Sequence, residues 1–144
     1  MTQFFKDLDF GKVYEAKFLE CVDDYDEAVQ APDKCFPDWD WNLRRGDTWT
    51  KYEVKSDRVA NRTGNFFIEC KCSNKPSGIN TTKSDFYYIF VIGTKGEVVD
   101  VYEIPTDVLR DFCKSGKYNT RCCYNEGHNM SEGYIIPIKE IYKF

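Results

Sequence analysis

The uninterrupted apolar run from Phe86 to Ile92 constrains the fold of this chain most strongly. A run of this length, rich in aromatic and β-branched residues and without polar alternation, is typical of a strand buried on both faces. It is far shorter than the roughly 20 apolar residues of a membrane-spanning helix. Other elements must cover both faces of such a strand, so we expect a layered domain built around it and no membrane partner.

Periodicity and turn signals predict the elements around this central strand. Apolar residues recur at helical spacing from about Phe10 to Val22, and a later helix is expected to begin with Thr106 as N-cap and to end at Gly116. Strands are predicted at 39–44, 48–55, 65–71, 98–104, 118–124 and 134–138, and a loop with a short helical turn at 77–84. The order αβββ(α)ββαββ indicates an α/β or mixed α+β fold with one main, mixed sheet flanked by helices.

Length, charge and cysteine content set further limits. No repeat, low-complexity tract or linker divides the 144 residues, so we expect a single domain over 1–144. Twenty Lys and Arg against 24 Asp and Glu give a net charge of −4, which excludes a surface coated with positive charge but not a local basic groove. The start of the chain has no signal-peptide pattern, so we interpret the seven cysteines as free thiols in the cytoplasm. Their spacing, and that of the single histidine His128, does not match a zinc site.

A hairpin is predicted where the strands 39–44 and 48–55 flank Gly46-Asp47, a pair that suits a type II′ turn. A two-residue loop fixes the register of a hairpin, and it places Arg45 opposite Thr48. Counting back from that pair gives the partners of every other residue in the two strands.

This register gathers charged side chains on one face of the hairpin. Asp40 falls opposite Glu53, and Asp38 falls opposite Lys55, with Cβ atoms of partners about 5 Å apart. Glu53 and Lys55 share a face because they are two residues apart. The simplest interpretation of such a cluster is an exposed ladder of cross-strand charges without a functional role. The alternative is a site, because two carboxylates at this distance repel each other unless a cation lies between them.

An oxygen-only site of this kind suits Mg²⁺ or Mn²⁺. A lysine beside it can stabilise negative charge on a phosphoryl group or on an attacking hydroxide. The pattern therefore favours metal-assisted phosphoryl chemistry if the cluster is a site.

The same residues resemble a known family. Pro37-Asp38, or Asp40, followed by Glu53-Val54-Lys55 resembles the signature of the PD-(D/E)XK nucleases, the restriction-endonuclease-like enzymes that include the archaeal Holliday-junction resolvases. In detail the chain looks most similar to small phage- and virus-type members, in the segments Tyr52 to Asp57, Thr63 to Glu69 and Ser77 to Tyr87. The resemblance covers most of the chain and implies a restriction-endonuclease-like core.

The resemblance implies that the protein is a Mg²⁺-dependent DNA endonuclease, with Mn²⁺ as a substitute for Mg²⁺. Asp40 and Glu53 would bind the metal together with the Val54 carbonyl, and Lys55 would position or activate water. Glu15 on the first helix matches an acidic residue that many members place near the metal. A structure-selective, phage- or virus-encoded enzyme, such as a junction resolvase or a homing-type nuclease, would fit this description and would act in the host cytoplasm.

Two metal-ligand assignments stay open in the sequence. Asp38 fits the literal Pro-Asp motif, whereas Asp40 fits the strand register. Glu69 lies on the polar face of the predicted strand 65–71, where it is either an additional ligand or a partner for Lys71.

An acidic protein that approaches DNA needs local positive charge or hydroxyl groups near its site. The residues that would supply these contacts are Arg44, Arg45, Lys51, Thr82 and Lys83. Ordinary surface charge and a capping turn are the competing interpretations. A homodimer would suit cleavage of both strands, since that reaction needs two sites. The alternatives to a nuclease are a catalytically silent nucleic-acid- or protein-binding module on the same fold and an interaction protein with an unrelated α+β fold.

Overall fold

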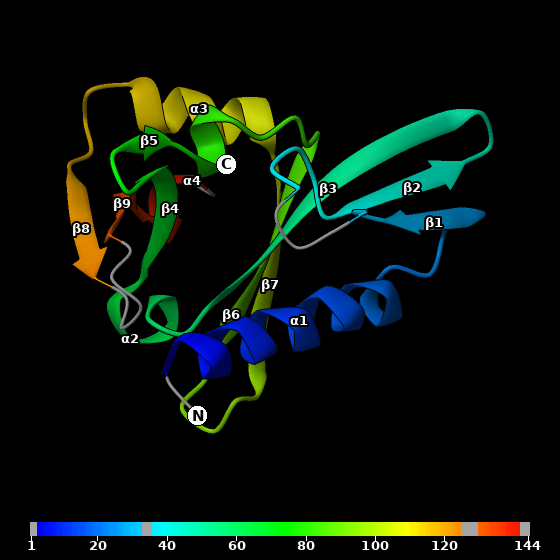
Figure 1. Cartoon of the computed structure of the whole chain (residues 1–144), viewed down its shortest axis with the longest axis horizontal. Coiled ribbons are helices and arrows are strands. Elements are labelled where there is room, and N and C mark those ends of the chain that lie inside the picture. The colour runs from blue at the N-terminus through cyan, green and yellow to red at the C-terminus, as the bar shows by residue number, and fades with distance from the viewer. Residues whose placement is uncertain (1–2, 33–35, 125–129, 142–144) are drawn as a thin grey trace.

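The computed structural model describes residues 3–32, 36–124 and 130–141, which form two β-sheets and the helices around them (Figure 1). The elements in chain order are α1 (Gln3–Cys21), β1 (Glu27–Gln30), β2 (Trp41–Arg45), β3 (Thr48–Asp57), α2 (Ala60–Thr63), β4 (Asn65–Cys72), β5 (Lys75–Pro76), the 3₁₀ turn η1 (Gly78–Asn80), β6 (Phe86–Ile92), β7 (Val98–Pro105), α3 (Thr106–Lys114), β8 (Thr120–Tyr124), β9 (Met130–Pro137) and α4 (Ile138–Ile141).

The larger sheet has five strands in the order β1-β2-β3-β6-β7. It is a mixed sheet, because β3 and β6 run parallel while the other neighbours are antiparallel. The apolar run is strand β6, and its residues from Tyr87 to Ile92 are all buried. The predicted central strand and the mixed sheet are therefore confirmed.

The expectation of one main sheet is wrong, because four strands form a second, antiparallel sheet in the order β5-β4-β9-β8. Strand β4 alternates as predicted, with Phe66, Ile68 and Cys70 buried. Alternation shows that a strand has one buried face, but it does not show which strands pair with it. The pairing of β4 with β9 joins segments that are distant in sequence, and no local signal specifies it.

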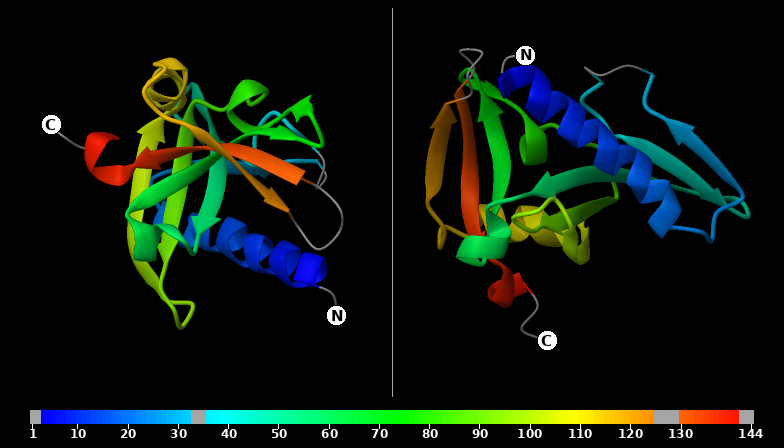
Figure 2. Two further views of the ribbon diagram at one scale, coloured as in Figure 1. Left: turned by 90° about the vertical axis from the view of Figure 1, so that its left-hand side faces the viewer. Right: turned by 90° about the horizontal axis from the view of Figure 1, so that it is seen from below.

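The two faces of the larger sheet pack on different partners. Helix α1 covers one face, where Phe18 contacts the rings of Tyr52 and Tyr88 at centroid distances of 5.0 and 4.9 Å. The other face shares a core with the smaller sheet and α3, in which Phe66, Tyr87 and Leu109 are almost completely buried. Figure 2 shows α1 on one side of the larger sheet and β8 and β9 on the other. No described helix has the length and apolarity needed to cross a membrane.

The structure contains short elements that no periodicity could reveal. Strand β1, helix α2, strand β5 and helix α4 each have four residues or fewer. A segment this short contains about one helical turn or one strand repeat, too little for a recognisable pattern. Helix α1 also begins earlier than expected, at Gln3.

Helix α3 begins at Thr106, but Thr106 is not its N-cap. Pro105 holds that position, and no side chain caps the helix there. The Thr106 hydroxyl is buried and instead lies 3.1 Å from the hydroxyl of Ser84. The other end agrees with the prediction, since Gly116 adopts a positive φ of 82° directly after the helix.

The hairpin of β2 and β3 has the predicted register, with Arg45 opposite Thr48 and Trp41 opposite Tyr52. Gly46 has a φ of 61°, as the first central residue of a type II′ turn requires. The ladder ends at Trp41, whereas β3 continues to Asp57. The far half of β3 therefore pairs with β6 on one side only, and the candidate site lies along its open edge.

Candidate metal and catalytic site

Asp40 directly precedes β2 and lies next to the part of β3 that has no strand partner on that side. Its backbone N–H donates to the Tyr52 carbonyl at 2.9 Å, which extends the hairpin by one residue beyond the ladder. Its side-chain Oδ2 then accepts the backbone N–H of Val54 at 2.7 Å. The carboxylate thus takes the place of a missing strand partner. Asp40 itself lies beyond the paired residues of the ladder, but this arrangement keeps its carboxylate within electrostatic reach of Glu53.

Glu53 and Lys55 project from the same face of β3 and form an ion pair. The Lys55 Nζ atom lies 3.4 Å from Oε2 of Glu53, and the other carboxylate oxygen, Oε1, accepts a hydrogen bond from the Thr82 hydroxyl at 3.2 Å. The Glu53 side chain is 13% exposed and that of Lys55 44%. The carboxylate therefore lies at the base of the site, and the ammonium lies at its opening.

The electrostatics of Asp40 reflect this crowding of negative charge. Burial, and after it the nearby Glu53 carboxylate, raise the pKa of Asp40 to about 7 against the opposing effect of Lys55. Two carboxylates that cannot both ionise easily are a common feature of sites that hold a cation. A divalent ion between them would favour the ionised form of Asp40.

Lys55 is held in its protonated form. The Glu53 carboxylate raises the pKa of Lys55 above its ordinary value, an effect that outweighs the opposing effect of burial, and Tyr87, Asp40 and Glu69 add to it. A lysine of this kind is charged at neutral pH. It suits the stabilisation of negative charge rather than the acceptance of a proton.

Helix α1 brings Glu15 toward the same cluster. The Trp41 indole N–H donates to the Glu15 carbonyl at 2.9 Å, which ties this turn of the helix to the start of β2. Burial raises the pKa of the Glu15 carboxyl, with Lys55 opposing and Glu53 adding to the shift. Glu15 therefore lies within electrostatic reach of both groups, although 38 residues separate it from Glu53 in the numbering.

Glu69 approaches the cluster from the smaller sheet. It contributes to the raised pKa of Lys55, and its Oε2 accepts a hydrogen bond from the Ser77 hydroxyl at 3.0 Å. The structure thus places Glu69 on the Lys55 side of β4. Its role as an additional ligand or as a partner of Lys71 stays a prediction.

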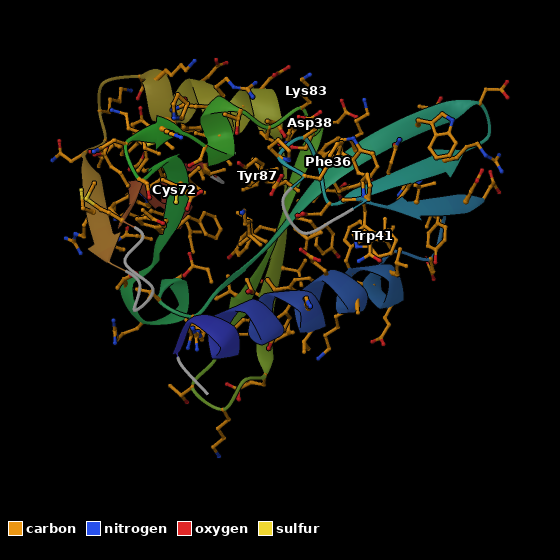
Figure 3. The ribbon with its side chains drawn as sticks, in the orientation of Figure 1. Phe36, Asp38, Trp41, Cys72, Lys83 and Tyr87 are labelled. Carbon is orange, nitrogen blue, oxygen red and sulfur yellow. The ribbon has the colours of Figure 1, made fainter. Side chains whose placement is uncertain are left out.

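Asp38 lies outside the pair formed by Asp40 and Glu53. Its carboxylate lies 3.9 Å from the Nζ of Lys83, and its carbonyl accepts the Lys83 N–H at 2.8 Å. Figure 3 shows Asp38 and Lys83 next to each other, where the hairpin joins the body of the molecule. The expectation that Asp38 lies opposite Lys55 is wrong, because the β2–β3 ladder ends at Trp41.

Two of the predicted DNA-contacting residues are ion-paired on the hairpin arm. Arg44 Nε lies 3.2 Å from Glu27, and Arg45 lies 3.1 Å from Asp24. These acidic partners come from β1 and the segment before it. They offset the positive charge that the two arginines were expected to offer to DNA.

The other three predicted contacts lie nearer the site. Lys83 has a side chain that is 72% exposed, and Lys51 is half-buried with its backbone N–H on an Asp85 carboxylate oxygen at 2.8 Å. Thr82 is buried, and its hydroxyl is engaged with Glu53, the Asp38 carbonyl and Ser84. Contact of these residues with DNA stays a prediction.

Sequence reasoning missed the groups that hold Glu53 from below. A chain of hydroxyls runs from Thr82 to Ser84 at 3.0 Å and on to Thr106 at 3.1 Å. Arg110 of α3 donates to the carbonyls of Ile79 and Thr82 at 3.3 Å. No sequence pattern predicts this network, because its residues meet only when the 77–84 loop packs against α3.

Tyr87 was also missed as part of the site. It is the β6 partner of Glu53 in the parallel ladder, so both side chains lie on one face. The residue is 1% exposed, and its hydroxyl has no hydrogen-bond partner in the described parts of the chain. Burial raises the pKa of Tyr87, and Lys55 opposes that shift. The β3–β6 pairing could not be inferred from sequence, so nothing marked Tyr87 except its place in an apolar run.

The oxygen atoms of the candidate ligands suit a hard cation, although the described side chains do not form a complete metal-binding group. Within residues 3–32, 36–124 and 130–141, no three His, Cys, Asp or Glu side chains form a group that could hold a metal ion. The candidate ligands are two carboxylates, on Asp40 and Glu53, and the carbonyl of Val54. The Val54 N–H points to the open edge of β3, and in a strand the carbonyl of the same residue points to that edge too. Oxygen-only sets of this kind are typical of Mg²⁺ and Mn²⁺, which keep several water ligands.

No family model and no curated protein matches this sequence. Membership of the PD-(D/E)XK nucleases therefore stays a prediction. What supports it is the geometry of Asp40, Glu53 and Lys55 along the edge of β3.

Proposed function

We propose that this protein is a divalent-metal-dependent DNA endonuclease with a restriction-endonuclease-like core. The observation that carries the proposal is the arrangement of Asp40, Glu53 and Lys55, with the Asp40 carboxylate on the Val54 N–H at 2.7 Å and the Lys55 ammonium 3.4 Å from Glu53. Two carboxylates that bind a metal ion and a protonated lysine beside them can together assist hydrolysis of a phosphodiester.

Each group has a chemical role in this proposal. Asp40, Glu53 and the Val54 carbonyl would hold Mg²⁺, with Mn²⁺ as a substitute. When bound, such an ion polarises a phosphoryl oxygen and lowers the pKa of a water molecule. The Lys55 ammonium stabilises the negative charge that develops on the phosphoryl group as water attacks phosphorus and the P–O bond to the leaving strand breaks.

Glu15 and Thr82 support this chemistry from opposite sides. Thr82 orients Glu53 through the 3.2 Å hydrogen bond to Oε1. Glu15, a carboxyl whose pKa is raised by burial, lies on the α1 side and would orient a water molecule near Lys55. Residues that lock a ligand in one orientation commonly matter to metal affinity as much as the ligands do.

A nicking assay tests the proposal directly. Supercoiled plasmid and a four-way junction would be incubated with wild type, Glu53→Gln and Lys55→Gln, in Mg²⁺, Mn²⁺ or EDTA. Matched controls are Asp47→Asn in the exposed hairpin turn and Lys71→Gln on the exposed face of β4. We expect metal-dependent cleavage that both site variants lose and both controls keep. Cleavage that survives in Glu53→Gln would overturn the assignment of the site.

A catalytically silent binding module is the second candidate, and one observation favours it. Both Glu53 oxygens and Oδ2 of Asp40 already have partners within the protein. A cluster satisfied in this way can be structural. Binding of DNA without cleavage, and without a rise in melting temperature on addition of Mn²⁺, would favour the module over the nuclease.

The proposed oligomeric state follows from the reaction, and the proposed cellular compartment follows from the free thiols. Cutting both strands of a duplex needs two sites, which a C2 homodimer would supply. The described cysteines are all free, which fits a reducing cytoplasm, including that of a host cell. Analytical ultracentrifugation with and without DNA would test the dimer.

A further inference from the structure

Strand β8 forms an open edge of the smaller sheet. Figure 1 shows it at the outer side of this sheet, away from the hairpin of β2 and β3. It pairs with β9 on one side, and no strand of the described residues pairs with its other side. An edge of this kind presents main-chain N–H and C=O groups with which a further strand can pair.

The register of β8 shows which of its residues direct their backbone outward. The Ile135 N–H of β9 donates to the Asn119 carbonyl at 3.1 Å, and Arg121 belongs to the same register. Every second residue of an antiparallel ladder bonds to the partner strand, so Arg121 bonds to β9 while Thr120 and Cys122 direct their N–H and C=O groups outward. Cys122 is the middle residue of β8, and the outward groups are therefore centred on it.

Nothing in the sequence of β8 hinders pairing with another strand. Its residues Thr-Arg-Cys-Cys-Tyr include no proline and no acidic residue, and its ladder with β9 has no bulge. Prolines, charges and bulges are the means by which proteins protect edge strands from association. Cys122 and Cys123 are exposed free thiols, so the strand is accessible from solvent.

Strand β7, at one edge of the larger sheet, is protected in this way. Oδ1 of Asp100 accepts the Val101 N–H at 2.9 Å, which removes this donor from any further strand. The ladder between β7 and β6 also contains a bulge after Val91. A carboxylate on a main-chain N–H and a bulge both disfavour the addition of another strand.

The two remaining edges are unsuited to pairing with a second copy of themselves. Strand β5 has two residues, and one of them is Pro76, which has no N–H to donate. Strand β1 has four residues and lies at the end of the acidic run 23–27, so two copies would bring like charges together. Among the described strands, β8 is therefore the edge that suits self-association. One such edge in each chain would limit the association to a dimer.

We propose that two copies of this chain pair through antiparallel β8 strands and form one continuous sheet across a two-fold axis. Complete overlap of the two strands places Cys122 opposite the same residue of the second copy. Arg121 then lies opposite Cys123, so that no like charges are direct cross-strand partners. A partner of the same sequence thus satisfies the outward backbone groups along the whole of β8.

The dimer would orient the two candidate sites toward the same side. Lys55 lines one cavity with Arg121 and Cys123, which share a face of the smaller sheet. Cross-strand partners share a face, so this face continues from one copy to the other in the joined sheet. Cleavage of both strands of one DNA would use this arrangement if the proposed function holds. The pairing of β8 itself does not depend on that reaction.

Sedimentation velocity over a wide range of protein concentration, in a reducing buffer, tests the proposal. We expect a reversible monomer–dimer equilibrium for wild type and for Cys122→Ser. Cys122→Lys places two ammonium groups opposite each other and should weaken the dimer about tenfold or more. Val99→Lys adds the same charge to the exposed β7 edge and is the matched control, with wild-type association expected. Monomeric wild type, or an unweakened dimer of Cys122→Lys, would overturn the proposal.

Cross-linking of thiols tests the register of the pair. The Cα atoms of a hydrogen-bonded antiparallel pair lie about 5.5 Å apart, which a disulfide can span. Diamide would oxidise the two Cys122 thiols to a disulfide, and it would itself take up their two hydrogen atoms and become a hydrazine. We expect a covalent dimer of wild type, Cys21→Ser and Cys123→Ser but not of Cys122→Ser. Equal cross-linking of Cys122→Ser, or none of wild type, would overturn the pairing centred on Cys122.

The dimer and the nuclease fail in different ways. A dimer centred on Cys122 without metal-dependent cleavage would support the pairing of β8 and overturn the nuclease. Metal-dependent cleavage by a protein that stays monomeric with and without DNA would overturn the pairing and leave the nuclease intact. A wild-type protein that stays monomeric but binds a strand of another protein at β8 would also overturn the pairing.

Discussion

The Val54 backbone N–H donates to the Asp40 carboxylate at 2.7 Å, and this one hydrogen bond joins the two halves of the candidate site. It fixes the acidic side chain that directly precedes β2 against the strand that carries Glu53 and Lys55. Because the bond uses only one oxygen of Asp40, the carboxylate keeps further acceptor capacity for a cation. The site is thus held in place by the hairpin itself.

Asp40→Asn keeps a side-chain acceptor for Val54 but removes the negative charge. We expect the variant to fold with wild-type stability or slightly above it, because the repulsion between Asp40 and Glu53 disappears. It should lose metal binding, so that Mn²⁺ raises the melting temperature of wild type but not of the variant. Thermal unfolding with and without Mn²⁺ measures this. An equal Mn²⁺ shift in both proteins would exclude Asp40 as a ligand.

The stability of the metal-free protein should fall as pH rises toward neutrality. Burial raises the pKa of Asp40 from its ordinary 3.8 to about 7, so between these values the folded state binds more protons than the unfolded state. The free energy of unfolding then decreases with pH over this window and is unaffected by this group above it. Urea unfolding in EDTA at pH 5, 6, 7 and 8 would show the slope, which Asp40→Asn should reduce, while the raised pKa of Glu15 still contributes in the same direction.

A cation should reverse this trend. Metal binding requires ionised Asp40, so Mn²⁺ should stabilise the protein more at pH 8 than at pH 6. Titrations followed by melting temperature at the two pH values provide the measurement. Stabilisation that is stronger at pH 6 would contradict the assignment of the raised pKa to a metal ligand.

Much of the site follows from local sequence signals. Gly46-Asp47 fixes the hairpin register as far as Trp41 opposite Tyr52, and Asp40 and Glu53 each follow directly on that pair. Period-two alternation correctly puts Glu53 and Lys55 on one face of β3. These inferences succeed because turn geometry and strand pleat act within about 15 residues, where no choice of distant partner is involved.

What could not be predicted depends on partners far apart in the chain. Tyr87 meets Glu53 only because β6 pairs in parallel with β3, and β4 leaves the main sheet because it pairs with β9. Thr106 shows the same limit, since its sequence context indicates an N-cap but its hydroxyl bonds Ser84 inside the protein. Tertiary contacts override local preference at such positions.

Replacing Lys55 should slow cleavage without weakening the binding of the metal ion. Lys55→Gln removes a protonated ammonium that contacts Glu53 but supplies no metal ligand. We expect a fall in the cleavage rate of about 100-fold or more, as for other groups that stabilise transition-state charge, while Mn²⁺ affinity is unchanged or higher. Lys71→Gln, at an exposed cation on β4, is the matched control. A loss of Mn²⁺ affinity that parallels the loss of rate would point to a structural role for Lys55.

Thr82 should act as a positioning residue for Glu53. Thr82→Val keeps the shape of the side chain but removes the hydroxyl that donates to Glu53 and contacts Ser84. Loss of a buried hydrogen-bonding group costs about 1–3 kcal/mol, whereas Thr82→Ser should retain most of the stability. Beyond stability, the Mn²⁺ concentration for half-maximal cleavage should rise in Thr82→Val and recover in Thr82→Ser. An unchanged metal dependence would confine Thr82 to the packing of its loop.

Gly78 should be among the least replaceable positions of the loop that carries Thr82. Its φ is +53°, and a Cβ atom there would lie 2.1 Å from the Glu69 carbonyl oxygen, so η1 would have to move away from β4. Left-handed strain together with overpacking predicts a loss of about 2–5 kcal/mol for Gly78→Ala. Gly46 is the matched control, because its φ is +61° but nothing lies within 4 Å of its added Cβ. Gly46→Ala should therefore cost only the backbone strain, about 1–2 kcal/mol. Urea unfolding of the two variants measures the difference, and equal losses would mean that the contact between η1 and β4 does not restrain the loop.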